Sequence, residues 1–164
     1  MSDIKYGFDP VFNAESRVLI LGSFPSVKSR QIEFYYGNKQ NRFWKTLCSF
    51  FNQPVPDGTE LKRAFLLEKR VALWDIVTEC EIDGSSDSSI KNYKVARLED
   101  VLSVAPIELI ILNGGKAFEI FKKYYPDILV PWVKLPSTSP ANTRDGTAQW
   151  YEALEKVFGN TNAQ

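Results

Sequence analysis

The chain has 164 residues, of which 44% are hydrophobic and 13% aromatic, enough for a globular protein with a packed core. It contains no histidine, which excludes Ser-His-Asp and Cys-His nucleophiles, histidine metal ligands and a histidine general base. Twenty Lys and Arg balance twenty Asp and Glu, so the total charge gives no argument for a nucleic-acid partner.

Four short apolar runs have the composition of strands buried on both faces of a sheet. They are residues 17–22, 71–77, 108–113 and 129–135. Pro131 has no backbone N–H to give to a neighbour, so the last run is expected at a sheet edge. Helical spacing of apolar residues occurs over 41–51, 60–69, 98–104, 116–125 and 147–158. This alternation predicts an α/β fold, a three-layer α/β/α sandwich with a central parallel sheet of about four strands.

Each predicted strand is followed by a polar or glycine-rich segment, and in parallel sheets such segments meet at one edge. These segments are GSFPS (22–26) with FYYGNKQNRFW (34–44), Asp75 with the polar run 83–89, NGG (113–115) and LPSTSPAN (135–142). None is a G-x-G-x-x-G motif or a P-loop, so a nucleotide cofactor is not supported. The run 83–89 is either part of this edge or a mobile surface loop.

The sequence is polarised in charge. Residues 17–70 carry ten Lys or Arg against four Asp or Glu, whereas residues 71–113 carry three against eight. The basic block contains the segment 34–44, so the predicted site lies in the positive part of the chain. Blocks of this kind fold either onto one patch or onto scattered solvated surfaces.

The two cysteines, Cys48 and Cys80, are too few for a metal cluster, and we expect them to be buried small hydrophobic residues. No apolar run approaches the length of about 20 residues that spans a membrane, and the first residues lack the pattern of a signal peptide. We therefore expect a single domain over residues 1–164, monomeric and cytoplasmic, with no membrane contact, no cofactor and no metal.

Together these segments resemble the uracil-DNA glycosylase superfamily, and within it most of all the hypoxanthine-DNA glycosylases. Those enzymes carry G-S-x-P-S, Y-Y-G-N-x-Q-N-x-F-W and L-P-S-T-S-P-A, which stand here ungapped at 22–26, 35–44 and 135–141. The similarity extends over roughly residues 8–158. It implies removal of deaminated bases from DNA during base excision repair, chiefly hypoxanthine, with xanthine and uracil as further candidate bases.

The resemblance also implies roles for particular residues. Asn38 would be catalytic, orienting water through its carbonyl while its NH₂ is held by a neighbour, although a Gly-Asn pair also suits a left-handed turn. Asn113 would hydrogen-bond the extruded base, and Tyr36 would stack on it. Where the mismatch-specific branch has its catalytic asparagine, this chain has Phe24, which would form a wall. Gly22 and Ser23 complete the expected base-binding set.

Binding of an extruded nucleotide also requires contacts to phosphates. The hydroxyls and cations expected to supply them are Ser26, Ser137, Ser139, Lys39 and Arg42. The loop 140–144 is the candidate for filling the gap in the helix. Asn41 is expected to cap a helix. No lysine is placed to form a Schiff base, so a monofunctional glycosylase is expected.

Three other functions remain open at this point. One is a uracil or mismatched-thymine glycosylase, and another is a non-catalytic reader of damaged DNA on the same fold. The third is a free nucleoside hydrolase that uses Asp75 and Glu79 as paired carboxylates.

Overall fold

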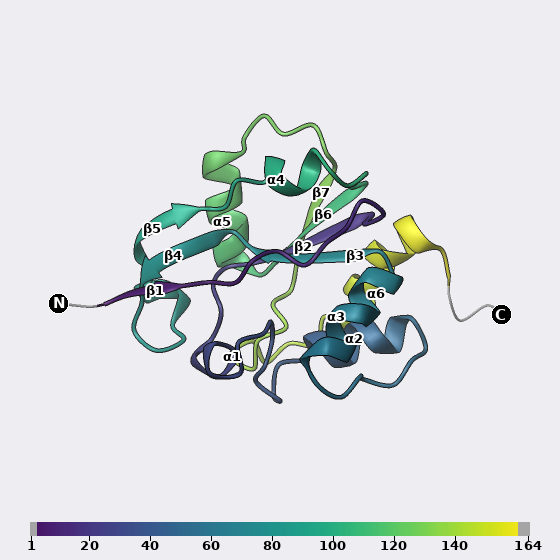
Figure 1. Ribbon diagram of the computed structural model, residues 1–164, viewed down its shortest axis with the longest axis horizontal. Coiled ribbons are helices and arrows are strands. Elements are labelled where there is room, and N and C mark those ends of the chain that lie inside the picture. The colour runs from purple at the N-terminus through teal and green to yellow at the C-terminus, as the bar shows by residue number, and fades with distance from the viewer. Residues whose placement is uncertain (1–2, 161–164) are drawn as a thin grey trace.

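The computed structural model describes residues 3–160, and its centre is a four-stranded parallel sheet (Figure 1). The strands are β3 (Val71–Asp75), β2 (Val18–Gly22), β6 (Leu109–Asn113) and β7 (Trp132–Leu135), in this spatial order. Every residue of β2, β3 and β6 is buried, because both faces of the sheet are covered. The edge position expected from Pro131 is confirmed, since β7 pairs only with β6 within the described chain.

The strand register brings the four carboxyl ends together. Gly22 pairs with Asp75, and Asn113 pairs with Leu135. Between them, Leu21 of β2 pairs with Leu112 of β6. The residues that leave the sheet after these positions therefore emerge at a common edge, as predicted.

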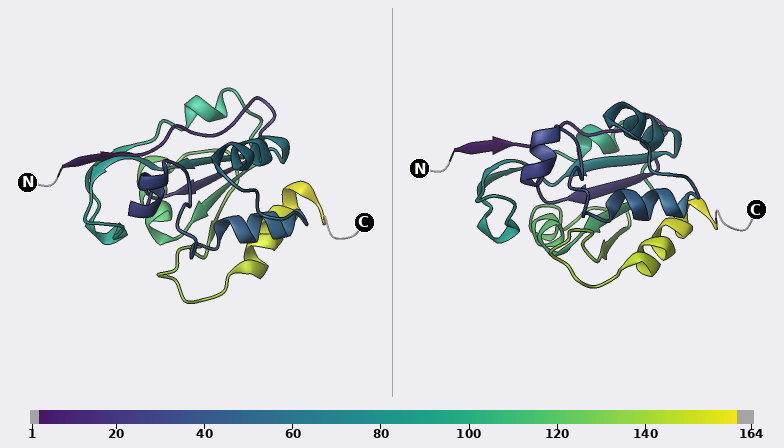
Figure 2. Two further views of the ribbon diagram at one scale, coloured as in Figure 1. Left: turned by 60° about the horizontal axis from the view of Figure 1, so that its bottom comes forward. Right: turned by 90° about the horizontal axis from the view of Figure 1, so that it is seen from below.

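Helices cover both faces of the sheet, which confirms the predicted α/β/α layering (Figures 1 and 2). One face packs against α2 (Phe43–Phe50), α3 (Thr59–Glu68) and α6 (Thr147–Phe158). The other face packs against α4 (Glu99–Leu102) and α5 (Gly115–Tyr124). Alternate residues of each strand serve the two cores: Ile20 points to the first and Leu21 to the second.

A second sheet, which was not expected from the sequence, extends the second core. It is antiparallel, in the order β1 (Ile4–Tyr6), β4 (Val77–Glu81) and β5 (Lys91–Val95). The single strand predicted over 71–77 is therefore wrong. The N–H of Ile76 bonds to the Gly22 carbonyl at 2.8 Å and that of Val77 to the Ser23 carbonyl at 3.1 Å. The chain thus follows the loop after β2 and begins a new strand.

Smaller differences concern the ends of elements. A short helix α1 (Val27–Ile32) and a 3-10 turn (Asp87–Ser89) were not predicted, and α4 is shorter than expected. Cys48 and Cys80 are free and buried, as predicted. Across residues 3–160, none of the helices combines the length and the apolar character needed to span a bilayer.

Candidate functional site

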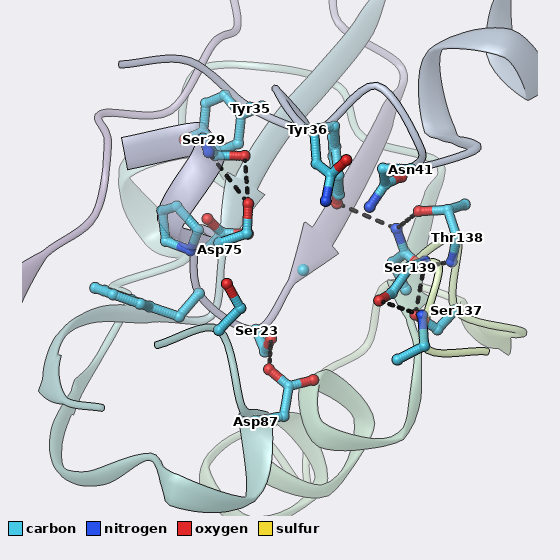
Figure 3. A pocket seen from close by; sticks show the side chains of 18 of the residues that line it. Ser23, Ser29, Tyr35, Tyr36, Asn41, Asp75, Asp87, Ser137, Thr138 and Ser139 are labelled. Atoms are coloured by element: carbon cyan, nitrogen blue, oxygen red, sulfur yellow. Dashed lines mark hydrogen bonds between the residues drawn. The ribbon is translucent and has the colours of Figure 1, made fainter. Parts of the chain in front are cut away.

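A cavity of about 260 Å³ lies at the carboxyl edge of the parallel sheet (Figure 3). All four predicted segments contribute to its lining, one of them through Asp75 together with Ser85 and Asp87 of the run 83–89. Its volume lies below the range of about 300–1,000 Å³ usual for drug-sized ligands, which suits one nucleobase better than a dinucleotide. Of the predicted site residues, the cavity is lined by Gly22, Ser23, Phe24, Ser26, Tyr36, Asn38, Asn113, Ser137 and Ser139. Lys39 and Arg42 are not among its lining residues.

The side-chain amide of Asn113 is held in one orientation at the end of β6. Its Oδ1 accepts the backbone N–H of Thr138 at 3.0 Å. Its Nδ2 donates to Thr138 Oγ1 at 3.0 Å and to Tyr36 Oη at 3.2 Å. Asn113 and Thr138 are both buried. Because a backbone N–H can only donate, the amide oxygen is fixed and one of its lone pairs stays available to a ligand.

Thr138 was missed as a site residue. It stands in the segment that follows β7, called here the serine-proline loop (135–144), between the two serines that were predicted. Its contribution depends on a contact across 25 residues, which the motif alone does not reveal.

Tyr36 stands between the amide and the aromatic core. It adopts a left-handed conformation with φ of 54°, and its ring stacks on Phe43 with centroids 4.1 Å apart. Burial, with a contribution from Asp75, raises the pKa of its hydroxyl far above the usual range, so the hydroxyl is neutral. One ring face is covered by Phe43, and the residue also lines the cavity.

Asn38 lines the cavity in a tight turn. Its Oδ1 accepts the N–H of Gln40 at 2.9 Å, and its backbone carbonyl accepts the N–H of Asn41 at 2.9 Å. The protein thus holds the oxygen of this amide, whereas the expectation was that a neighbour would hold the NH₂. The left-handed residue of this segment is Tyr36, so the left-handed turn considered for Asn38 does not form. A second lone pair of Oδ1 remains for a water.

Two neighbours of Asn38 organise the surrounding backbone. Asn41 Oδ1 accepts the N–H of Phe43 at 2.9 Å, although the cap position of α2 that was expected for Asn41 is occupied by Arg42. The Arg42 guanidinium donates to three carbonyls of the serine-proline loop, those of Ser137 (3.3 Å), Asn142 (2.8 Å) and Arg144 (3.2 Å). The structure thus gives Arg42 a loop-fastening role, and its phosphate contact stays a prediction.

The predicted phosphate-binding serines differ in what their hydroxyls already do. Ser26 caps α1, accepting from the Ser29 N–H and donating to the Ser29 hydroxyl, each at 3.1 Å. Ser137 and Ser139 each accept the backbone N–H two residues further on, at 3.1 and 3.2 Å. Their hydroxyl hydrogens can therefore be donated to an anion, whereas that of Ser26 is already used.

The polar run 83–89 packs against the loop after β2 and forms one wall of the cavity. Ser85 Oγ accepts the N–H of Val27 at 2.9 Å, and Arg30 donates to the Gly84 carbonyl at 2.6 Å. Ser23 donates its hydroxyl to Asp87 Oδ1 at 2.6 Å. Of the two interpretations of this run, the structure supports a place at the site edge.

Asp75, the last residue of β3, also lines the cavity and is 5% exposed. Burial and the Asp87 carboxylate raise its pKa to about 7. Glu79, its supposed partner in a nucleoside hydrolase, is instead paired with Lys94 at 3.5 Å on the second sheet and does not line the cavity. The paired-carboxylate arrangement is therefore not formed.

Comparison with known proteins agrees with this geometry. The family model of the uracil DNA glycosylase superfamily matches residues 10–158. A hypoxanthine DNA glycosylase of Methanosarcina acetivorans is 34% identical over 143 residues, covering 86% of this chain and 90% of that protein. A hypoxanthine DNA glycosylase of Methanosarcina barkeri is 29% identical over 160 residues, covering 93% and 99%.

A solved structure gives the same answer for the fold. The NMR structure of a proposed uracil DNA glycosylase from Methanosarcina acetivorans superimposes with a TM-score of 0.82 at 30% identity, covering 98% of this chain and 99% of that one. The chain belongs to the uracil DNA glycosylase superfamily, and the resemblance drawn from its motifs is confirmed.

Proposed function

We propose that this chain is a DNA glycosylase that removes deaminated bases, hypoxanthine first among them, during base excision repair. The observation that carries the proposal is the fixed amide of Asn113 inside a cavity of nucleobase size. The names of the two Methanosarcina relatives support the same substrate. Free, buried thiols are typical of a reducing compartment, which supports a cytoplasmic location, and we propose that the enzyme acts as a monomer.

Base selection follows from the orientation of Asn113. Its Oδ1 faces a ligand as an acceptor, because the Thr138 N–H holds it. Hypoxanthine presents N1–H at its pairing edge and xanthine does the same, whereas adenine presents a bare nitrogen there. An amide that could flip freely would bind either hypoxanthine or adenine. The Asn113 amide can flip only by losing its hydrogen bond from the Thr138 N–H. Uracil also carries an N–H beside a carbonyl, so Asn113 alone does not exclude it.

Hydrolysis breaks the bond between C1′ and the base nitrogen, and the bonding electrons leave with the base. A water supplies its oxygen to C1′ and releases a proton to solvent, and the departing base takes up a proton. Asn38 would position this water through the free lone pair of Oδ1, the other lone pair being held by Gln40. No residue in this account has to accept a full proton, which fits a chain without histidine.

Contacts to the DNA backbone would come from the rim of the cavity. Ser137 and Ser139 can donate hydroxyl hydrogens to phosphate oxygens, and the exposed Lys39 adds a positive charge beside Asn38. The loop 140–144, which joins the same rim, is our candidate for entering the helix where the base leaves. These contacts would offset the few kcal/mol needed to extrude a nucleotide.

A substrate panel tests the proposal. Matched duplexes carrying deoxyinosine, deoxyxanthosine, deoxyuridine or a G·T mismatch are incubated with the protein, and abasic sites are cleaved with alkali. We expect cleavage at deoxyinosine and no adduct on borohydride trapping. Preference for deoxyuridine or G·T would instead favour a uracil or mismatch enzyme, and binding without cleavage would favour a non-catalytic reader.

A further inference from the structure

Asp75 has no partner for one of its buried oxygens. Within residues 3–160, its Oδ2 is the buried side-chain nitrogen or oxygen that lacks a hydrogen bond. Leaving such a group unpaired costs free energy, and native proteins rarely do so without a functional reason. Asp75 lines the cavity, so a turn of its carboxyl group can bring this oxygen to a water or a ligand there. In Figure 3, Asp75 lies on the side of the cavity opposite Ser137 and Thr138.

The position of this carboxyl group depends on Gly22. A Cβ at Gly22 would lie 2.5 Å from Asp75 Oδ1 and 2.9 Å from Tyr36 Oη. Such distances are not sterically possible, so a residue with a side chain would push the carboxyl group or the hydroxyl aside. The first motif of the chain thus leaves room for Asp75 and Tyr36 to reach the cavity together.

The Asn113 amide itself has no hydrogen left to donate to a base. Both hydrogens of the Asn113 amide are already donated, to Tyr36 and to Thr138. Besides its N1–H donor, hypoxanthine carries three acceptor atoms, O6, N3 and N7. In its protonated form, an aspartic acid side chain supplies an O–H donor to such an atom.

We infer that Asp75 contacts the extruded base as a protonated carboxylic acid, donating a hydrogen bond to an acceptor atom of that base, and is a specificity-determining residue. This inference rests on the proposed function. The bond would strengthen as negative charge develops on the departing base, so it would favour the transition state over the bound substrate.

The surroundings of Asp75 favour the protonated form. Burial and the charge of Asp87 raise its pKa to about 7. Tyr35 and Tyr36 are the other ionisable groups that interact with it, and their pKa values are raised so that both stay neutral. Lys116 acts on Asp87 rather than on Asp75. Near neutral pH, a substantial fraction of the carboxyl groups would therefore carry the proton.

The test is single-turnover cleavage of a deoxyinosine duplex between pH 6 and 9. For the wild type we expect a rate that falls about tenfold per pH unit above the pKa of Asp75. Asp75→Asn keeps an N–H donor of the same shape, so its rate should be independent of pH and within about tenfold of the wild-type maximum. Asp75→Ala should react at about 1% of the wild-type maximum at every pH, the usual effect of removing one such donor.

Two further variants serve as controls. Asp83→Asn alters an exposed carboxylate in the same 83–89 loop and should leave the profile unchanged. Asp87→Asn removes the charge that raises the pKa of Asp75, so the decline should begin at lower pH. If the wild type releases no hypoxanthine, the proposed function fails. If the wild type is active but Asp75→Asn and Asp75→Ala keep its rate and its pH profile, the inference about Asp75 is overturned.

Discussion

The free energy of unfolding should depend on pH through the ionisation of Asp75. Its carboxyl group has a pKa near 3.8 in the unfolded chain and about 7 in the folded one, so the folded state binds the proton more tightly. Stability from this group is therefore fully present below about pH 4 and is lost as the pH rises toward 7. At about 1.4 kcal/mol per pKa unit, the loss is about 4 kcal/mol.

Asp75→Asn tests this at the level of one residue. The variant should match the wild type near pH 4 and exceed its unfolding free energy by up to about 4 kcal/mol at pH 8, because the amide cannot ionise. Urea denaturation of both proteins at pH 4.5, 6 and 8 measures the difference. A difference that does not change with pH would show that Asp75 is not protonated in the fold.

The roles of single residues were predictable where they depend on local sequence. The hydrogen bond of Asn41 at the start of α2 depends on a residue two positions further on, and the burial of the cysteines follows from the residue type. The fixed orientation of Asn113 does not, because it comes from Thr138, which is 25 residues away. The unpaired oxygen of Asp75 is likewise a property of the assembled cavity and has no signal in the motif.

Among the elements, the serine-proline loop owes its place to Arg42. One guanidinium nitrogen donates to three of its carbonyls, and the Arg42 N–H donates to the Thr138 carbonyl at 2.9 Å. This loop carries both Thr138 and the serines of the cavity rim. A change at Arg42 would therefore affect base binding through Asn113 and phosphate binding through Ser137.

Arg42→Lys should loosen this loop, because the lysine side chain ends short of the guanidinium nitrogen that makes the three bonds. We expect a loss of stability of about 1–3 kcal/mol and faster amide exchange across residues 137–144. Hydrogen exchange followed by mass spectrometry measures the second effect. Lys45→Arg, at an exposed position of α2, is the matched control and should change neither quantity. Unaltered exchange in Arg42→Lys would contradict the fastening role.

The elements differ in how well the sequence predicted them. The parallel strands were recognisable because each is a short apolar run buried on both faces. The antiparallel sheet was not, because β1 has three residues and β5 is mostly exposed and carries two lysines. Its β4 begins only one residue after β3 ends, with no glycine or proline between them, so two strands looked like one. The polar run 83–89 gave no sign of its contacts with the loop after β2.

At the scale of the whole molecule, zero net charge conceals the basic block 17–70. DNA binding that involves this block should weaken with salt, because each phosphate contact releases condensed counterions. Lys39 stands beside Asn38 and is exposed, whereas Lys156 lies in the last turn of α6, in the C-terminal part of the chain.

Charge reversal at Lys39 and at Lys156 should have different effects on DNA binding. Lys39→Glu should lower the affinity for a deoxyinosine duplex and reduce the slope of its salt dependence by about one. Lys156→Glu should leave both nearly unchanged. Fluorescence anisotropy with labelled duplex, at salt concentrations from about 50 to about 300 mM, measures the affinity and the slope of its salt dependence. Equal losses in the two variants would place the DNA elsewhere on the surface.

The most direct test of the proposed activity is the detection of the released base itself. A deoxyinosine duplex is incubated with excess protein, and the small-molecule fraction is analysed by mass spectrometry. We expect one free hypoxanthine per duplex with an abasic strand left behind, and a rate about 100-fold lower for Asn38→Ala. A bound duplex that releases no hypoxanthine, or an Asn38→Ala variant as fast as the wild type, would contradict it.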